Sequence, residues 1–467
     1  MAVKKIGGMP YHLWNPATPM DKFLSFLGFG PTYIVRGEGP YFYNARGKRY
    51  LNGNSATWNF GIGFGREKII EAAASQMRAL PFSSGWGLSH PKAVELAARL
   101  VEITGGRYQH VYLGANGSEM VETALKITRQ YHRQSPQISD RSRYKIIALR
   151  ESYHGFSYGA ISAAGKPLDE EKFGPLAPGF MQIDPPYCYR CPFGKSGYPE
   201  CGLACALALQ EKIEAEGPET VAAFILEPVM GEYGVIAPPE PYYQLIGEIC
   251  QRYGLLLIAD EVTTGFGRTG QLFASQGWVP QPDILCLGKL ISGGYLPLAA
   301  TLTTEAIFER FLGEDKYLRH GSTNSGHPVT AAVGLAAIDI ILREKLPENA
   351  ARVGEHMIAG LKSLMGHHAI IGDVRGKGMM FAVELVEDRD TKQPLDPDRV
   401  FDFVLDIADR GLLISLDGLR FLPPLIIDEA VADEMVDIID KSLAMGIGAN
   451  VSRKLRMARE FMDARRG

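Results

Sequence analysis

Two short apolar runs, each followed by charged residues, constrain the fold of this chain more than any other feature. The first run, Leu255–Ala259, ends in the acids Asp260 and Glu261. The second, Ile284–Leu287, is followed among glycines by Lys289. Runs of this length are typical of strands buried on both faces of a parallel sheet. Because ligands bind outside the carboxyl ends of such strands, we expect the acid and the amine to meet in one crevice.

An acid and a lysine in one crevice have two interpretations. They can form a simple ion pair. Alternatively, they form a pyridoxal phosphate site, in which the lysine makes a Schiff base and the aspartate keeps the pyridinium nitrogen protonated, so that the ring acts as an electron sink. The pair alone leaves both interpretations open.

A longer pattern surrounds the pair. The string from Ile258 to Gly270 is continued by Asp283–Lys289 and by Ser292–Leu298. Together they resemble the signature of class III aminotransferases, the fold-type I pyridoxal phosphate enzymes. The resemblance extends from about residue 37 to about residue 428, with several motifs in order. It implies an α/β fold, with a large domain whose mostly parallel sheet is covered by helices and a smaller α+β domain.

The sequence departs from the family pattern at two places. Leu290 stands where glycine usually follows the Schiff-base lysine, and Ser322–Asn324 replaces a more aromatic version. Both departures affect the expected pocket shape rather than the chemistry.

Length and charge limit the classes of protein to consider. A chain of 467 residues exceeds a usual single core. We expect an N-terminal arm and part of the small domain over 1–65, a large cofactor-binding domain over 66–328, and the rest of the small domain over 329–467. The net charge of -4 gives no basic surface for nucleic acid. No apolar stretch reaches the roughly eighteen residues of a membrane span. These features predict a cytoplasmic protein.

Four of the six cysteines lie close together in the sequence, at Cys188, Cys191, Cys201 and Cys205. Two such pairs could ligate a structural zinc ion. The alternative is a packed loop in which Cys205 begins a helix. The three residues inside the second pair and the lack of histidine in the loop weigh against zinc, and the choice stays open. So few cysteines argue against a disulfide scaffold.

A glycine-rich turn offers a phosphate site. The strand expected at Val111–Leu113 leads through Gly117 and Ser118 into a helix that runs to about Tyr131. Backbone N–H groups and the positive end of the helix dipole would face an anion there. Ser118 could instead be an ordinary N-cap. The resemblance favours phosphate, because the family uses its Gly-Ser-Glu turn for the cofactor phosphate.

The resemblance implies further cofactor-site residues. Tyr153 would stack on the pyridine ring, with His154 packed behind the cofactor. Glu227 ends another strand near the substrate, and Val262 lies beside the paired acids. Thr323 resembles the threonine that reaches the phosphate of a neighbouring subunit, which implies a homodimer with shared active sites.

Three residues are candidates for substrate binding. Trp58 occupies the position of a family pocket aromatic, although a core position would explain it equally well. Trp86 lies in a Gly- and Ser-rich loop of the kind that carries specificity. Arg420 matches the family arginine that grips a carboxylate and swings aside for an apolar group. Its planar fork suits bidentate binding; the alternative is a surface salt bridge.

One motif is interpreted as a decoy. Gly265–Gly270 matches the dinucleotide-binding fingerprint. A true fingerprint opens a helix directly and has an acid about twenty residues further on. Neither condition fits the sequence here, so nucleotide binding is not expected.

The combined prediction is a transaminase of the omega type. Lys289 would carry the cofactor and then move the substrate proton as acid and base, while Asp260 holds the ring nitrogen. An amine or omega-amino acid would give its amino group to a keto acid such as pyruvate in ping-pong fashion. An aminomutase or decarboxylase of the same fold is the alternative, and a non-enzymatic zinc or nucleotide binder is a more distant one.

Overall fold

A computed structural model describes residues 5–6, 9–18, 20, 33–415 and 418–444. Most of the predicted N-terminal arm and the tail after Ala449 lie outside the described residues.

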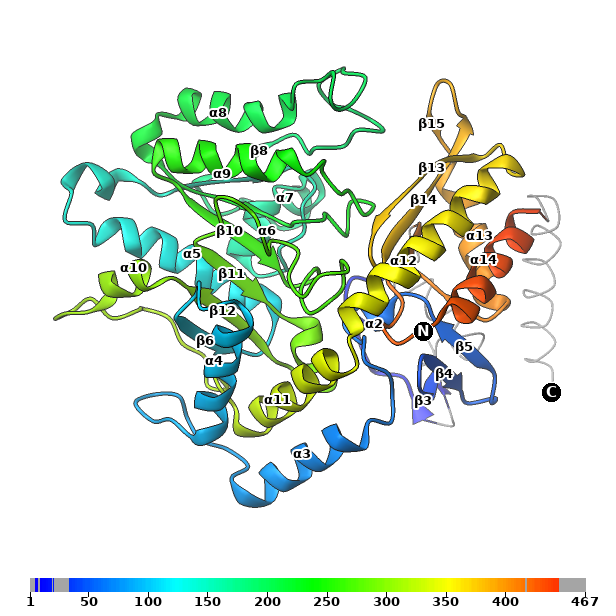
Figure 1. The fold of residues 1–467 in the computed structure, drawn as a ribbon, viewed down its shortest axis with the longest axis horizontal. Coiled ribbons are helices and arrows are strands. Elements are labelled where there is room, and N and C mark those ends of the chain that lie inside the picture. The colour runs from blue at the N-terminus through cyan, green and yellow to red at the C-terminus, as the bar shows by residue number, and fades with distance from the viewer. Residues whose placement is uncertain (1–4, 7–8, 19, 21–32, 416–417, 445–467) are drawn as a thin grey trace.

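A seven-stranded sheet forms the larger part of the molecule (Figure 1). Its strands, in spatial order, are β6 (His110–Gly114), β12 (Ala299–Thr303), β11 (Ile284–Leu287), β10 (Leu256–Glu261), β9 (Val221–Leu226), β7 (Lys145–Leu149) and β8 (Phe180–Ile183). Only β12 is antiparallel to its neighbours. The predicted mostly parallel sheet is therefore confirmed.

The central strands are buried on both faces, as their unbroken apolar sequences predict. Leu257 and Phe224 point into one core, whereas the neighbouring Ile258 and Ile225 point into another. Helices α8 (Ala204–Glu216) and α9 (Pro241–Tyr253) contribute to the first core. Helices α5 (Gly117–Arg133) and α6 (Tyr158–Ala164) contribute to the second. Polar groups are thereby restricted to the strand ends.

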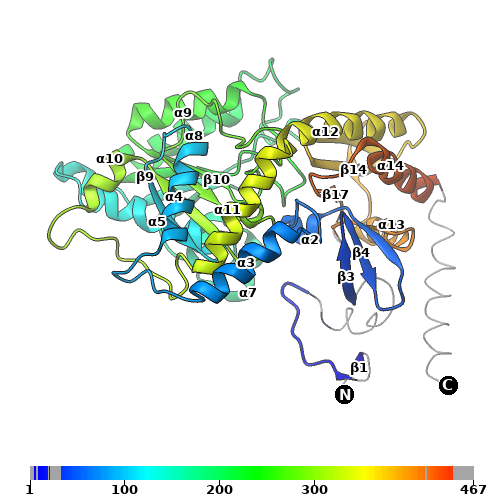
Figure 2. The same ribbon diagram turned by 60° about the horizontal axis from the view of Figure 1, so that its bottom comes forward.

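The remaining helices of this part lie at its edges. Helix α11 (Pro328–Arg343) packs on α3 (Glu67–Ala79) and α4 (Pro91–Ile103), as Figure 2 shows. Two short helices, α7 (Pro167–Phe173) and α10 (Glu305–Phe308), complete this part.

Two four-stranded sheets form the smaller part, at the right of Figure 1. One contains β13 (Ile371–Lys377), β14 (Met380–Asp388), β15 (Gln393–Pro394) and β17 (Leu419–Phe421). The other contains β16 (Leu412–Leu413), β5 (Arg49–Asn52), β4 (Tyr41–Asn44) and β3 (Ile34–Glu38). The helices beside them are α12 (Leu346–Ser363), α13 (Pro397–Asp409) and α14 (Glu429–Ala444). Because β16 pairs with β5, N-terminal and C-terminal segments share one sheet. The exact domain boundaries stay a prediction.

Two local features bear on the site. The segment α2 (Ser55–Trp58) has positive φ angles of 48 to 65° at all four residues, a left-handed turn rather than a regular helix. Turns, not a helix, follow Gly265–Gly270, as its interpretation as a decoy requires. Among the described residues, no helix has the length and apolar character to cross a membrane.

Candidate active site

A cavity of about 940 Å³ opens at the carboxyl ends of β6, β7, β10 and β11. Its lining brings together seven residues that the sequence selected: Gly117, Ser118, Tyr153, His154, Asp260, Val262 and Lys289. Four separate segments supply them, so the sheet brings distant parts of the sequence to one place. Asp260 and Lys289 therefore lie in one cavity at the ends of neighbouring strands, as predicted.

Asp260 is buried and held from two sides. One carboxylate oxygen lies 2.7 Å from Nδ1 of His154, and the other accepts a hydrogen bond from the backbone N–H of Val262 at 3.1 Å. The second ring nitrogen of His154 is also buried and has no hydrogen-bond partner among the described residues. These contacts fix the carboxylate and make His154 a support for Asp260.

Lys289 occupies a strained position at the cavity wall. Its φ is +47°, which is unusual for a residue with a side chain and is typical of functional sites. The Nζ donates a hydrogen bond to Oγ1 of Thr263 at 2.6 Å. Burial lowers the pKa of the amine to about 8, although the nearby carboxylates of Glu227 and Asp260 oppose the shift. The neutral, nucleophilic amine is therefore accessible near neutral pH.

Glu227 follows β9 and lies behind the cavity wall. Its carboxylate accepts hydrogen bonds from the backbone N–H groups of Tyr153 at 2.9 Å and Gly231 at 3.2 Å. Burial raises its pKa to about 7. This residue positions the Tyr153 loop and the chain after β9.

The first turn of α5 forms another wall. Asn116, not Ser118, is its N-cap: the Asn116 side chain accepts from the N–H of Glu119 at 3.0 Å. The N-cap alternative for Ser118 is therefore wrong. The Ser118 hydroxyl accepts instead from the N–H of Ser157 at 2.9 Å. At Gly117, a Cβ atom would come within 2.6 Å of Val262, so the close approach of turn and strand end requires glycine.

Trp58 is a core residue that lies beside the cavity. It is 5% exposed and packs in a cluster with Val229, Met380 and Leu422. The Nζ of Lys289 lies 5.2 Å from its ring centroid, and the guanidinium of Arg420 lies 5.7 Å from it. The two interpretations of Trp58 are thus compatible.

Arg420 is buried and comes from β17 of the smaller part. Its Nη1 donates to the backbone carbonyl of Glu232 and lies 3.8 Å from the Glu232 carboxylate. Arg420 therefore does take part in an ion pair, but its guanidinium is buried near Trp58 and not at the surface.

Five predicted residues do not line the cavity. Trp58, Glu227 and Arg420 lie behind its wall, as described above, and Trp86 and Thr323 lie further away. Trp86 is 68% exposed, and its ring lies so close to Gly321 that a Cβ there would approach it to 2.5 Å. Thr323 is exposed on the adjacent turn. The roles of both residues stay predictions, and that of Thr323 depends on a second copy of the chain.

Sequence reasoning missed several residues of the site. Thr263 lies two residues after Glu261, and Ser157 lies in the same loop as Tyr153; neither of them was singled out from the sequence. Arg268 was treated only as part of the decoy. It is completely buried, and burial lowers its pKa to about 9. Its guanidinium donates to the carbonyl of Pro423 and to Oγ of Ser55 at 3.3 Å.

The cysteine cluster lies apart from this site. Its four cysteines line a separate cavity of about 10 Å³, and Cys205 lies at the start of α8. In the described part of the chain, no group of three or more His, Cys, Asp or Glu residues could hold a metal ion. The structure therefore gives the zinc alternative no support.

Comparison with known proteins adds independent evidence. The family model for class III aminotransferases matches residues 29–443. The adenosylmethionine-8-amino-7-oxononanoate aminotransferase of Geobacter sulfurreducens is 39% identical, over 92% of this chain and 95% of its own. The taurine–pyruvate aminotransferase of Bilophila wadsworthia is 37% identical, over 89% of this chain and 92% of its own.

A solved structure agrees with these relatives. The chain is similar to a pyridoxal phosphate-bound amine transaminase from an uncultivated Pseudomonas species, with a TM-score of 0.88 and 37% identity. The match covers 94% of this chain and 99% of the other. The chain is therefore an enzyme of the class III aminotransferase family, which depends on pyridoxal phosphate.

Proposed function

We propose that this enzyme transfers an amino group from an amine or omega-amino acid to a keto acid such as pyruvate, in two successive half-reactions. The observation that carries the proposal is the cavity shared by Lys289 and Asp260, with Trp58 beside both Lys289 and Arg420. The amine and the acid are at the ends of neighbouring strands, and the arginine can address a substrate carboxylate.

The residues present fit pyridoxal phosphate. The first turn of the 17-residue helix α5 offers N–H groups at Gly117 and Ser118 that have no intrahelical partner, which suits a phosphate. Asp260 is buried and oriented, which suits a charge-assisted hydrogen bond to a pyridinium nitrogen. Tyr153 and Val262 both line the cavity and suit contact with a flat ring. The cofactor, when bound, delocalises the electrons of a broken bond at the substrate carbon.

Lys289, Thr263 and His154 would then have different roles in the reaction. Lys289 would hold the cofactor covalently and, once released, carry a proton at Nζ between two carbon atoms. Its lowered pKa, about 8, suits a group that must both take and give a proton near neutral pH. Thr263 holds the Nζ in place through its hydroxyl. His154 keeps the Asp260 carboxylate oriented.

Substrate recognition would depend on Trp58 and Arg420. The indole supplies an apolar wall for the body of an amine, and the guanidinium can bind a carboxylate bidentately. Such a site has to accept both a keto acid and a donor without an α-carboxylate. The names of the relatives support this range, since one is a taurine–pyruvate aminotransferase and another an amine transaminase.

We also propose that the enzyme works as a homodimer in the cytoplasm. Trp86 and the turn at Thr323 form an exposed surface close to the cavity-forming loops, which suits burial against a second copy. All six cysteines are described, and all are unpaired, as is usual in a reducing compartment.

The proposal is tested by following the two half-reactions separately. Added amine should convert the bound cofactor from its aldehyde form to its amine form, with release of a carbonyl product, and pyruvate should restore the aldehyde form with release of alanine. Carbon dioxide release, or an isomeric amino acid as the product, would favour a decarboxylase or an aminomutase instead. A protein with bound cofactor that reacts with no amine in a broad screen would contradict the proposal.

A further inference from the structure

A strained turn, residues 230–236, lies in the loop between β9 and α9. Val235 has a φ of +57°, in the left-handed region that β-branched residues rarely adopt, and its side chain is completely buried. Met230 and Ile236 close the turn with two backbone hydrogen bonds of 2.9 Å. A strained backbone persists only where the surrounding contacts hold it, and such strain is frequent at functional sites.

The strained turn packs against residues of the active site. At Gly231, a Cβ atom would come within 2.8 Å of the Trp58 ring, and Val235 belongs to the same apolar cluster as Trp58. The carboxylate of Glu227 accepts hydrogen bonds from the N–H groups of both Gly231 and Tyr153. The position of the turn therefore affects the shape of the cavity on its Trp58 side.

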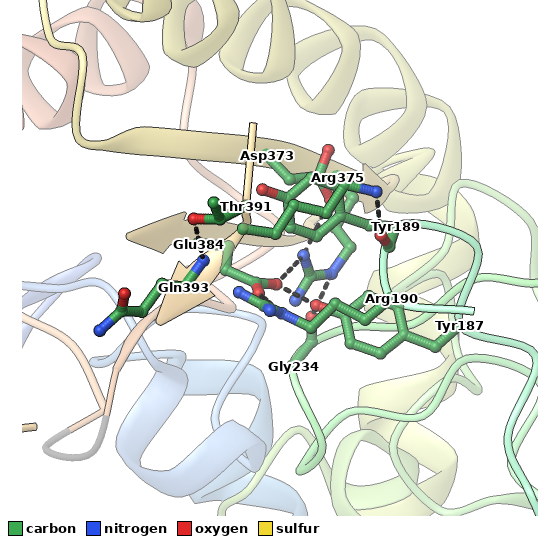
Figure 3. Close-up of polar contacts among 10 residues, drawn as sticks. Tyr187, Tyr189, Arg190, Gly234, Asp373, Arg375, Glu384, Thr391 and Gln393 are labelled. Atoms are coloured by element: carbon green, nitrogen blue, oxygen red, sulfur yellow. Dashed lines mark hydrogen bonds and ion pairs between the residues drawn. The ribbon is translucent and has the colours of Figure 1, made fainter. Parts of the chain in front are cut away.

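Arg375, on β13 of the smaller part, holds the strained turn by a carbonyl group. Its Nε donates a hydrogen bond to the carbonyl of Gly234 at 2.8 Å (Figure 3). This carbonyl belongs to the peptide bond between Gly234 and Val235, so the contact acts directly on the strained residue. The N–H of the same peptide bond donates to the carbonyl of Gly231 at 3.2 Å. Both polar groups of this peptide bond are therefore held.

The guanidinium of Arg375 is itself fixed by both parts of the molecule. Its Nη1 lies 2.7 Å from the carboxylate of Glu384 and 2.8 Å from that of Asp373, and the guanidinium lies 4.8 Å from the centroid of the Tyr187 ring (Figure 3). Glu384 also accepts hydrogen bonds from Tyr187 and Arg190 of the larger part. These contacts orient the guanidinium so that its Nε remains directed at the turn.

We propose that Arg375 is a positioning residue of the substrate pocket. It holds the strained turn against Trp58 and thereby fixes the wall that receives the body of the amine, although Arg375 does not line the cavity. This inference rests on the proposed function, which assigns that wall to Trp58. Arginine suits the task because its planar fork can bind carboxylates and a carbonyl at the same time, whereas lysine offers a single point charge.

The first test separates the charge of Arg375 from its hydrogen bond to Gly234. Arg375→Lys keeps a positive charge beside Glu384 and Asp373 but lacks the Nε–H that binds the carbonyl. We expect the KM for benzylamine, with pyruvate as acceptor, to rise about tenfold, the effect of one hydrogen bond from a charged donor. The midpoint of urea denaturation should change little. Arg375→Met should raise the KM equally and also lower the midpoint, because it removes the charge.

Lys377 provides the matched control on the same strand. Its Nζ lies 2.6 Å from the exposed carboxylate of Glu240, so it also joins β13 to the connection between β9 and α9. Glu240 directly precedes α9 and lies outside the strained turn. Lys377→Met should leave the KM for benzylamine within about twofold of the wild-type value. A tenfold rise in this variant as well would show that any contact between the two parts has the same effect, and would overturn the inference.

Amide hydrogen exchange of the holoenzyme reports on the turn without turnover. Peptides that cover residues 231–236 should exchange about tenfold faster in Arg375→Lys than in the wild type, and at the wild-type rate in Lys377→Met. A double variant tests the route through the indole. In the Trp58→Leu background, Arg375→Lys should change the KM by less than about twofold, because the wall that it supports has been removed.

Three further outcomes would overturn the inference. They are a KM of Arg375→Lys equal to that of the wild type, an exchange rate of residues 231–236 that Arg375→Lys does not alter, and an undiminished KM effect in the absence of Trp58. If the wild type transfers no amino group, the proposed function fails, and the exchange rates still decide whether Arg375 holds the turn.

Discussion

Asp260 and Glu261 are consecutive acids that serve opposite sides of one strand. Asp260 contacts His154 at the cavity, whereas the Glu261 carboxylate accepts hydrogen bonds from Ala274, from both the N–H and the hydroxyl of Ser275, and from Thr264. Alternation of side chains along a strand produces this separation. Asp260 is therefore available for catalysis, whereas Glu261 stabilises the turns that follow β10.

The two acids should respond differently to loss of charge. Asp260→Asn should lower kcat/KM about 10²-fold or more, because the electrostatic contact to the cofactor is lost while the shape is kept. Glu261→Gln should lower the free energy of unfolding by about 2 kcal/mol or more, because an amide group would face buried N–H donors. Steady-state kinetics and urea denaturation of both variants measure these effects. The assignment is wrong if Asp260→Asn mainly loses stability while Glu261→Gln mainly loses rate.

Lys289→Ala should remove turnover while leaving the fold intact. The loss should reach about 10³-fold or more, because a single side chain supplies both the attachment point and the proton transfer. Amino-transfer assays and circular dichroism check the two parts of this prediction. Lys172→Ala, which removes an exposed lysine of α7, is the control. A Lys289→Ala protein with substantial activity would contradict the assignment.

The stability of the cofactor-free protein should depend on pH through Lys289. Burial lowers the pKa of this amine from 10.5 to about 8, so between these values the unfolded chain binds a proton that the folded chain does not. Stability should therefore rise with pH across this window, and below it the folded protein carries the cost of a buried charge. Lys289→Met should gain on the order of 2 to 3 kcal/mol near pH 7, and most of this gain should disappear above about pH 10.

Urea denaturation at several pH values measures the gain. Lys172→Met provides the matched control, since an exposed lysine should give a difference that does not change with pH. A constant difference between the Lys289→Met and wild-type proteins would show that burial of the amine does not govern the effect.

Mixing two impaired variants, Thr323→Ala and Lys289→Ala, tests whether the active site is shared between two chains. Thr323→Ala should bind the cofactor more weakly, by about tenfold for one lost hydrogen bond to a phosphate. A heterodimer of Thr323→Ala with Lys289→Ala should contain one intact site, because the lysine of one chain meets the threonine of the other. Activity at low cofactor concentration should then exceed that of either parent. Activity that never exceeds the parents would place Thr323 outside the partner's site.

The sequence predicted those strands and turns whose structure depends on their own residues. The apolar runs ending at Asp260 and before Lys289 became adjacent strands, since nothing but a doubly covered sheet buries such runs. Gly117 was selected as part of the glycine-rich turn, and it lies against Val262.

Tertiary contacts determined the features that the sequence did not predict. Asn116 replaces Ser118 as the cap of α5 because the Ser118 hydroxyl meets Ser157 from a distant loop. Arg375 and Glu384 had the appearance of ordinary polar strand residues, and their pairing over Tyr187 depends on how three segments pack. Contacts of this kind leave no periodic trace in a sequence.

The buried position of Arg268 has a consequence for how the chain can be divided. Its guanidinium is charged, and among the described residues it is held by neutral oxygens, including those of Ser55 and Pro423, which lie near opposite ends of the sequence. A fragment lacking either segment would lose acceptors for this cation and part of the packing that surrounds it. The enzyme should therefore resist splitting into separately expressed halves, and co-production of complementary fragments should rescue solubility where single fragments aggregate.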